Sequence, residues 1–262
     1  MPTSALHVAR TGLEAQDARM RVIANNLANI GTTGYKRDRA NFATLAYQDD
    51  RVAGQQSSNE TAYATGLNLG TGVSVQSTTS ITTQGTLSTT GNALDLALDG
   101  DGYFQVQLPG GKLGYTRAGN FSRSAEGQLV TAQGYPVQPA ISVPEDAASI
   151  TVANDGTVSV TTSASAAPTE IGQITVASFA NPAGLQALGD NFLAETAASG
   201  AAQIGPAGDG VRGAIRQGML EASNVNVVEE LVDMIECQRA YEINSKMISA
   251  VDEMLRNANQ TL

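Results

Sequence analysis

A seven-residue repeat near the start of the chain constrains the fold more than any other feature. Between residues 6 and 30, side chains recur every seven residues in two series offset by three residues, and only Gln16 interrupts their apolar character. This is the spacing of the a and d positions of a coiled coil, so it predicts a helix that packs along one side against a partner helix. Gly31 and Gly34 predict the end of this helix. The two series are Leu6, Leu13, Met20 and Leu27, and Ala9, Gln16, Ile23 and Ile30.

A second helical stretch is predicted from about residue 226 to the C-terminus. The chain contains no Gly after Gly218 and no Pro after Pro206. Asn226 followed by Glu229 is a variant of the capping box that starts many helices. The apolar residues of this stretch cover more than one a/d seam, which predicts burial against more than one neighbour.

The charges of the two ends are opposite in sign. In residues 1–39, basic side chains outnumber acidic ones by three, whereas in residues 221–262 acidic side chains outnumber basic ones by five. Opposite charges favour pairing and influence which partners meet. The terminal helices are therefore predicted to pair as a coiled coil, with the residues between them forming an insertion.

The middle of the chain, about residues 66–200, has the signals of antiparallel β structure. Apolar and polar residues alternate in short runs, and clusters rich in Gly, Asp and Asn separate the runs. Asp99-Gly100-Asp101-Gly102 is predicted to be a hairpin turn. The polar segment 48–66 is interpreted as an extended or loosely ordered connection, and residues 197–213 as the return connection.

These patterns define an α+β fold with an inserted antiparallel β domain. The helical core domain is discontinuous and comprises residues 1–35 and 222–262. An extended connecting region comprises residues 36–90 and 197–221. The β domain comprises residues 91–196.

Charge and composition exclude several function classes. The net charge is −10, and the twelve Arg and three Lys are scattered along the 262 residues. A nucleic-acid-binding protein needs a basic patch, and anionic membrane surfaces are disfavoured for the same reason. The N-terminal residues lack the apolar core of a cleaved secretory signal. No run of apolar residues is long enough to span a bilayer, so no direct membrane insertion is expected.

Catalytic and cofactor sites also find little support. One His and one Cys, His7 and Cys237, exclude a His/Cys metal cluster and an intrachain disulfide. The run 208–213 fits the pattern GxGxxG, but it lacks the strand and helix that a dinucleotide site needs, so it is interpreted as a flexible connection. Cys237 lies within the second helix and is interpreted as a buried structural thiol. The chain is thus predicted to be no enzyme and to bind no metal or cofactor.

The wide apolar face of the second helix points to self-association. A pair of two helices leaves part of this face uncovered in a monomer, and exposed apolar surface of that size marks an interface. A heterologous interface, in which two different surfaces of the subunit meet, gives a closed ring or an open helical tube. The alternative is a helical hairpin that folds onto its own β domain. The candidate interface residues are Leu6, Leu13, Met20, Ile23, Leu27, Ile30, Val228, Leu231, Ile235, Ile243, Met247, Val251 and Leu255.

Two terminal motifs resemble those of the bacterial flagellar axial proteins, the rod and hook family. The segment ANNLANIGTTGYKR (residues 24–37) is similar to the N-terminal signature of the family, and residues 223–246 are similar to the C-terminal one. Residues 94–140 resemble the core of the family's β domain. The family motif residues are Asn25, Asn26, Asn29, Gly34, Tyr35, Lys36, Asn224, Gln238, Arg239, Tyr241, Glu242 and Asn244.

Within this family, the length of the chain, the segment QRAYEINSK (residues 238–246) and residues 47–72 are most similar to subunits of the distal rod. The resemblance implies a structural subunit of the flagellar basal body that polymerises into a hollow helical shaft and transmits torque to the hook. Implied partners are further copies of the chain, other rod subunits, hook or hook-junction subunits, the surrounding rings and the flagellar export apparatus. Export of this kind uses no cleaved signal and delivers the subunit to the periplasmic rod.

Three alternatives remain open. The chain could be another axial subunit, from the proximal rod or the hook. It could be a surface β protein with a coiled-coil stalk. It could also be an enzyme that uses paired carboxylates in a cleft of the β domain.

Overall fold

The computed structural model describes residues 2–56, 63–162 and 165–260, and the chain divides into two compact units. Unit 1 combines residues 1–27, 38–79 and 226–262. Unit 2 combines residues 28–37 and 80–225. The chain therefore passes between the units where the first helix ends, on either side of the segment 38–79, and just before the last helix.

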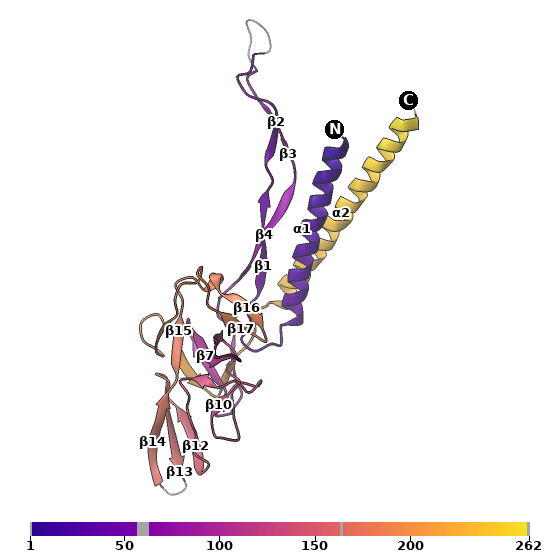
Figure 1. The fold of residues 1–262 in the computed structure, drawn as a ribbon. Helices are drawn as coiled ribbons and strands as arrows, with labels where there is room; N and C mark the ends of the chain where they lie inside the picture. Colours follow the sequence, from indigo (N-terminus) through magenta and orange to yellow (C-terminus); the bar gives the residue numbers. More distant parts are fainter. Residues whose placement is uncertain (1, 57–62, 163–164, 261–262) are drawn as a thin grey trace. The chain divides into compact units, whose positions relative to one another are not determined.

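Two long helices in unit 1 confirm the helical prediction for both ends of the chain. Helix α1 spans Pro2–Ala28 and helix α2 spans Val227–Gln260, and they lie side by side (Figure 1). Their contacts join late residues of α1 to early residues of α2, so the pair is antiparallel. The side chain of Asn226 caps α2, because its Oδ1 accepts a hydrogen bond of 3.1 Å from the backbone N–H of Val228.

The rest of unit 1 is a β-hairpin in two parts. Strand β1 (Asp38–Thr44) pairs with β4 (Val73–Ser80), and β2 (Tyr47–Arg51) pairs with β3 (Leu67–Gly70). The segment 48–66 is predicted to be an extended or loosely ordered connection. Its described residues include most of β2, which is extended chain, and residues 57–62 lie outside the description. Every residue of β2 and β3 is exposed. Strand β2 has no alternation of apolar residues in its sequence, whereas β3 lies at the start of the range 66–200 that is predicted to form β structure.

Unit 2 is built from antiparallel strands, as the sequence predicted. Its largest sheet has seven strands in the order β16-β17-β8-β7-β15-β18, with β11 also pairing with β7. A three-stranded sheet has the order β12-β13-β14, and the pairs β9–β10, β6–β19 and β5–β20 complete the unit. The strands are β5 (Leu87–Thr89), β6 (Leu96–Asp99), β7 (Tyr103–Gln107), β8 (Leu113–Thr116), β9 (Ser122–Arg123), β10 (Leu129–Val130), β11 (Val137–Gln138), β12 (Ala147–Val152), β13 (Thr157–Thr162), β14 (Ser165–Gln173), β15 (Thr175–Ser178), β16 (Gln186–Gly189), β17 (Phe192–Ala194), β18 (Gln203–Pro206), β19 (Ala214–Gln217) and β20 (Met219–Glu221), with a 3-10 helix at Pro182–Gly184.

Strand β7 is buried on both of its faces. Phe104 and Val106 point into the main apolar core, which also contains Leu98. On the opposite face, Tyr103 packs with Tyr115 in a second, smaller cluster. Alternation of apolar and polar residues marks only one buried face of a strand, so it does not show that the other face of β7 is covered as well.

The segment Asp99-Gly100-Asp101-Gly102 is not a hairpin turn. Strand β6 before it pairs with β19, whereas β7 after it pairs with β8, β11 and β15. The glycines serve close packing instead, because a Cβ on Gly102 would lie 2.3 Å from Cγ1 of Val176. The turn-forming residues thus carry the chain from one sheet to another.

Residues 197–221 are also more ordered than a connecting region. Strands β18, β19 and β20 lie within this range, and they pair with β15, β6 and β5. Residues 80–90 likewise belong to unit 2, whereas the segment 38–79 groups with the helices in unit 1. Long-range strand pairing, which local patterns do not encode, accounts for these differences from the predicted boundaries.

Candidate self-assembly interface

The contacts between α1 and α2 recur at regular intervals along α2. Glu230 accepts a hydrogen bond from Asn26, Cys237 donates one to the backbone of α1, and a Cβ added to Gly12 would lie 3.1 Å from Nδ2 of Asn244. These α2 positions are seven residues apart, and Val251, seven further on, is buried. One narrow seam of α2 therefore faces α1.

An ion pair adds charge complementarity to this seam. Nη2 of Arg19 on α1 lies 2.8 Å from Oδ1 of Asp233 and 3.8 Å from Oε2 of Glu236, both on α2. All three side chains are partly exposed, so the pair contributes at most about 1 kcal/mol. Its position shows that the opposite charges of the two ends meet in the folded chain.

Cys237 is fully buried in the seam. Its Sγ donates a hydrogen bond of 3.1 Å to the backbone carbonyl of Gln16. Burial raises the pKa of the Cys237 thiol above its ordinary value. The thiol therefore behaves as a small packing group, as the sequence indicated, and it allows the helices to approach closely.

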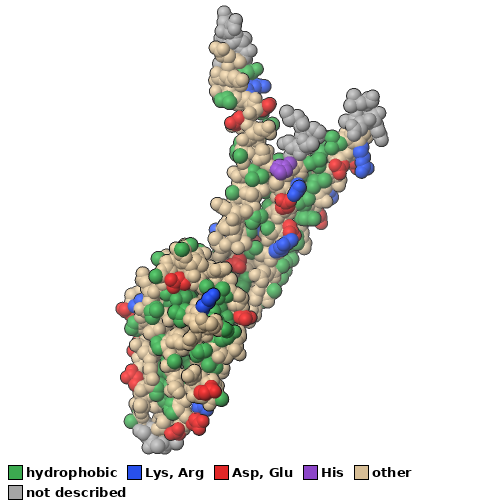
Figure 2. Space-filling model, in the orientation of Figure 1, with side chains coloured by type: hydrophobic (Ala, Val, Ile, Leu, Met, Phe, Trp, Pro, Cys, Tyr) green, Lys and Arg blue, Asp and Glu red, His purple; other side chains and the backbone are tan. Residues whose placement is uncertain are grey.

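The outward face of α2 carries large apolar side chains in contact with solvent. Val228 is 69% exposed and Ile243 is 62% exposed. Figure 2 shows hydrophobic side chains between charged ones along the helices. The exposed large apolar residues of α2 are Val227, Val228, Leu231, Val232, Ile235, Tyr241, Ile243, Met247 and Met254.

The predicted interface residues thus fall into different environments. On α1, Ile23 is buried and Leu6, Leu13, Met20 and Leu27 are half-buried, while Ile30 lies exposed beyond the end of the helix. On α2, Val251 is buried and Leu255 is half-buried on the side of α1. The others, Val228, Leu231, Ile235, Ile243 and Met247, are exposed.

The solvent side of α1 differs from that of α2, because it carries charged pairs. Arg10 pairs with Glu14, and Arg21 pairs with Asp17, each four residues apart and more than half exposed. Such pairs are satisfied within one helix and need no partner chain. The outward face of α2 is therefore the candidate for contacts with further subunits.

The motif asparagines do not share one role. Asn25 is exposed, whereas the side chain of Asn26 is buried and pairs with the backbone of Asp38. Its Nδ2 donates to the carbonyl of Asp38 and its Oδ1 accepts from the N–H of the same residue, each at 2.9 Å. Asn26 therefore ties the end of α1 to the start of β1 and, through Glu230, to α2.

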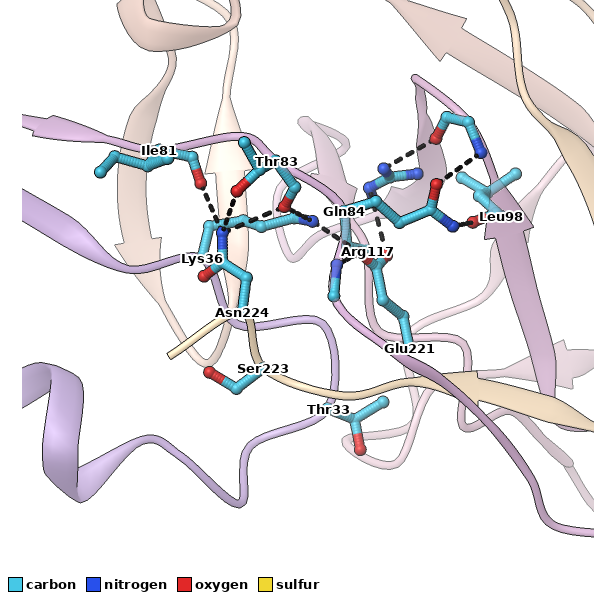
Figure 3. A network of polar contacts seen from close by, with 12 residues as sticks. Thr33, Lys36, Ile81, Thr83, Gln84, Leu98, Arg117, Glu221, Ser223 and Asn224 are labelled. Carbon is cyan, nitrogen blue, oxygen red and sulfur yellow. Dashed lines mark hydrogen bonds and ion pairs between the residues drawn. The ribbon is translucent and has the colours of Figure 1, made fainter. Parts of the chain in front are cut away.

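The motif residues Lys36 and Asn224 belong to a polar network in unit 2 (Figure 3), and the backbone N–H of the motif residue Gly34 donates to the carbonyl of Glu221 in the same network. Nζ of Lys36 lies 2.6 Å from Oε1 of Glu221, and Nε of Arg117 lies 3.4 Å from Oε2. The side chain of Glu221 is fully buried, and those of Lys36 and Arg117 are nearly so. Burial lowers the pKa of Lys36, and the hydrogen bond to Glu221 acts in the opposite direction.

The remaining motif residues lie on or near surfaces. Gln238, Arg239, Tyr241 and Glu242 are exposed on α2, while Asn29, Tyr35 and Asn244 are half-buried. Sequence reasoning missed Glu221 and Arg117, which form the centre of the network. Their partners are distant in the chain, so no local spacing marks them.

The part of the chain that the structure describes lacks the groups that a metal site or a membrane-spanning helix would need. No cluster of three His, Cys, Asp or Glu side chains that could hold a metal ion occurs there. No helix in that part is long and apolar enough to cross a membrane. A small cavity in unit 2 is lined by apolar residues such as Leu129 and Ile141, so it offers no carboxylate for acid–base chemistry.

The buried thiol predicts slow alkylation. We expect Cys237 in the native chain to react at pH 8 at least about 100-fold more slowly than in denaturant, because burial blocks access and lowers the thiolate fraction. The control is Ser245→Cys combined with Cys237→Ser, which places the thiol at an exposed position of α2. Equal rates for the two native thiols would contradict the packing of α1 against α2.

Gly34 predicts a sharp effect of a single methyl group. Its φ is +68°, and a Cβ there would lie 2.7 Å from the backbone carbon of Arg117. We expect Gly34→Ala to lower the free energy of unfolding by at least about 2 kcal/mol in urea titrations.

The matched control is Gly31→Ala. A Cβ at Gly31 meets nothing within 4 Å, so this change should leave stability the same or raise it. Similar effects of the two substitutions would contradict the tight packing at Gly34.

Sequence models of three flagellar protein families match the chain. "Flagella basal body rod protein" matches residues 6–36, "Flagellar hook protein FlgE/F/G D1 domain" matches residues 97–160, and "Flagellar basal body rod FlgEFG protein C-terminal" matches residues 216–261. These matches cover most of α1, a large part of unit 2 and α2.

Similar proteins align over nearly the whole chain. The flagellar basal-body rod protein FlgG of Buchnera aphidicola subsp. Acyrthosiphon pisum is 49% identical over 97% of this chain and 98% of its own length. FlgG of Agrobacterium fabrum is 46% identical over 98% and 99%. In Caulobacter vibrioides, FlgG is 47% identical and the rod protein FlgF is 32% identical. The chain belongs to the FlgG family of flagellar basal-body rod proteins, the structural subunits of the rod.

Proposed function

We propose that this chain is a subunit of the distal rod, and that it polymerises through its terminal helices into a hollow helical shaft. The carrying observation is the outward face of α2, where large apolar side chains lie exposed in the single chain. Burial of apolar surface contributes about 25 cal/mol per Å², so covering this face by further copies favours assembly.

The proposal assigns different roles to the two sides of α2. The seam at Glu230, Cys237 and Val251 holds α1 of the same chain in a coiled-coil arrangement, supported by the seven-residue spacing. The outward residues Val228, Ile235 and Ile243 contact neighbouring copies. The shaft then transmits torque from the motor to the hook, and no residue of the chain carries out a reaction.

Further partners follow from a place in the rod. Other rod subunits would contact one end of the assembly, and hook or hook-junction subunits the other. The basal-body rings would surround the shaft in the periplasm, and the flagellar export apparatus would deliver the subunit without cleavage of a signal. The higher identity to FlgG than to FlgF of the same organism supports a FlgG-type subunit, the type that the motif resemblance assigns to the distal rod.

Immunogold electron microscopy of purified basal bodies tests the location. An antibody against residues 94–180 should label the shaft between the inner membrane and the outer ring, in its distal part. Basal bodies from cells that lack the gene serve as the control. Label on the curved segment outside the cell would identify a hook protein instead, and label away from the flagellum would contradict the proposal.

Charge placed on the outward face of α2 should block assembly. We expect Ile243→Asp to abolish shafts in electron micrographs and to stop swimming, while the urea unfolding of unit 2 in the purified full-length chain stays as in the wild type. Ser245→Asp is the matched control, because it adds the same charge at an exposed polar position nearby. Shafts in cells that carry only Ile243→Asp would contradict the proposed interface.

A charge placed at an apolar heptad position of α1 should also block assembly. Leu27 is half-buried near the end of α1, so Leu27→Asp is expected to prevent assembly by disturbing the helical pair. The accompanying control is Ala24→Asp, which is exposed on the same helix. Normal assembly of a chain that carries Leu27→Asp would show that the apolar heptad positions of α1 are not needed for assembly.

A further inference from the structure

The polar network of unit 2 lies where the chain enters and leaves that unit. We name Lys36, Arg117, Glu221 and Asn224 the polar lock. Three chain segments meet at it: residues 34–37, which lead to β1; residues 80–86, which follow β4; and residues 221–225, which lead to α2. All of these residues belong to unit 2.

The Glu221 residue joins all three segments. Its Oε1 accepts hydrogen bonds from Nζ of Lys36 at 2.6 Å and from the N–H of Gly85 at 2.9 Å. Its backbone carbonyl accepts a further bond of 2.8 Å from the N–H of Gly34. Movement of either neighbouring segment therefore removes a partner from a buried carboxylate.

Asn224 repeats this arrangement with an uncharged side chain. Its Oδ1 accepts from the N–H of Arg37 at 2.7 Å, and its Nδ2 donates to the carbonyls of Ile81 and Thr83 at 2.8 and 3.0 Å. The bonds go to backbone atoms, so they fix the path of the chain itself.

The segments also touch directly. The N–H of Ile81 donates to the carbonyl of Arg37 at 2.8 Å, and the N–H of Ala222 donates to that of Thr86 at 2.9 Å. A Cβ on Gly85 would lie 2.0 Å from the carbonyl oxygen of Ala222, so the two backbones are in contact. No side chain could be inserted between them.

These contacts make separate opening of one segment unfavourable. A buried charge that loses one partner keeps its desolvation penalty without the compensating bond. Because Lys36, Gly85 and Arg117 share one carboxylate, opening one segment weakens the hold on the others. We infer that the polar lock makes residues 34–37, 80–86 and 221–225 open and close as one cooperative element.

This device exists in the single chain and does not depend on assembly. Its mechanical consequence rests on the proposed function. A force applied to β1, β4 or α2 would be distributed over all three segments where they enter or leave unit 2. The cooperative opening itself can be measured on the purified monomer, so its failure leaves the proposed role in the rod untouched.

Hydrogen exchange of the full-length chain tests the lock. We expect Glu221→Gln to raise exchange about tenfold or more in all three segments together, with β7 and β15 unchanged. Asp99→Asn is the matched control: it removes the carboxylate of an exposed ion pair with Arg216 in the same unit, and it should change none of the three segments. A rise in only one segment, or in none, would overturn the inference.

If Glu221→Gln does not fold, Asn224→Ala provides a second test, because this substitution leaves the buried charges of Lys36, Arg117 and Glu221 paired. The informative amides are Gly34, Gly85 and Ala222, whose hydrogen bonds do not involve the Asn224 side chain. We expect their exchange to rise together with that of Arg37. An increase confined to Arg37, the amide bonded directly to Asn224, would show that the segments open independently.

Discussion

The packing of α1 against α2 is the contact that joins the two ends of the chain. The two helices lie at opposite ends of the sequence, so their pairing closes a loop that contains everything else. The free-energy cost of loop closure grows only slowly with length, which makes an insertion of this size tolerable. The cost is offset along a narrow seam where the Cys237 thiol meets the backbone of Gln16 and where Asn26 reaches Glu230.

Two asparagines of the family motif have the same physical role. Asn26 in unit 1 and Asn224 in unit 2 each offer an amide that donates and accepts at the same time. Both use it to bind backbone groups of residues distant in the chain, and the residues bound, Asp38 and Arg37, are neighbours in sequence. Aspartate lacks the donor and alanine lacks both groups, so the amide itself is what these positions require.

Sequence reasoning succeeded where structure is set by local patterns. The seven-residue repeat predicted α1, and Asn226 predicted the start of α2, because periodicity and capping involve residues close in the chain. It failed where partners are distant. The prediction of a hairpin turn at residues 99–102 was wrong, because local turn residues contain no information about which strand β6 will join.

The same contrast between local patterns and distant partners applies to the residues of the candidate site. The motif drew attention to Asn25 and Asn26 alike, and only burial in the folded chain separates them. Glu221 stood out in no pattern, because its partners at positions 36, 85 and 117 come together only through the fold. Buried charges of this kind are recognised from the three-dimensional structure, whereas the exposed strand β2 lacks the alternation of apolar residues that would mark it in the sequence.

The width of the exposed face on α2 bears on how copies of the chain would assemble. At about 100° per residue, the exposed positions from Leu231 through Val228 to Met247 span roughly 160° around the helix axis. A coiled-coil seam with a single partner is narrower than this. A face of this width has room for two neighbouring helices. A subunit that presents different flanks to two neighbours forms a heterologous contact, which gives a closed ring or an open helical array rather than an isolated dimer. The polar outer side of α1 fits this arrangement, since its ion pairs are satisfied within the helix and need no further cover.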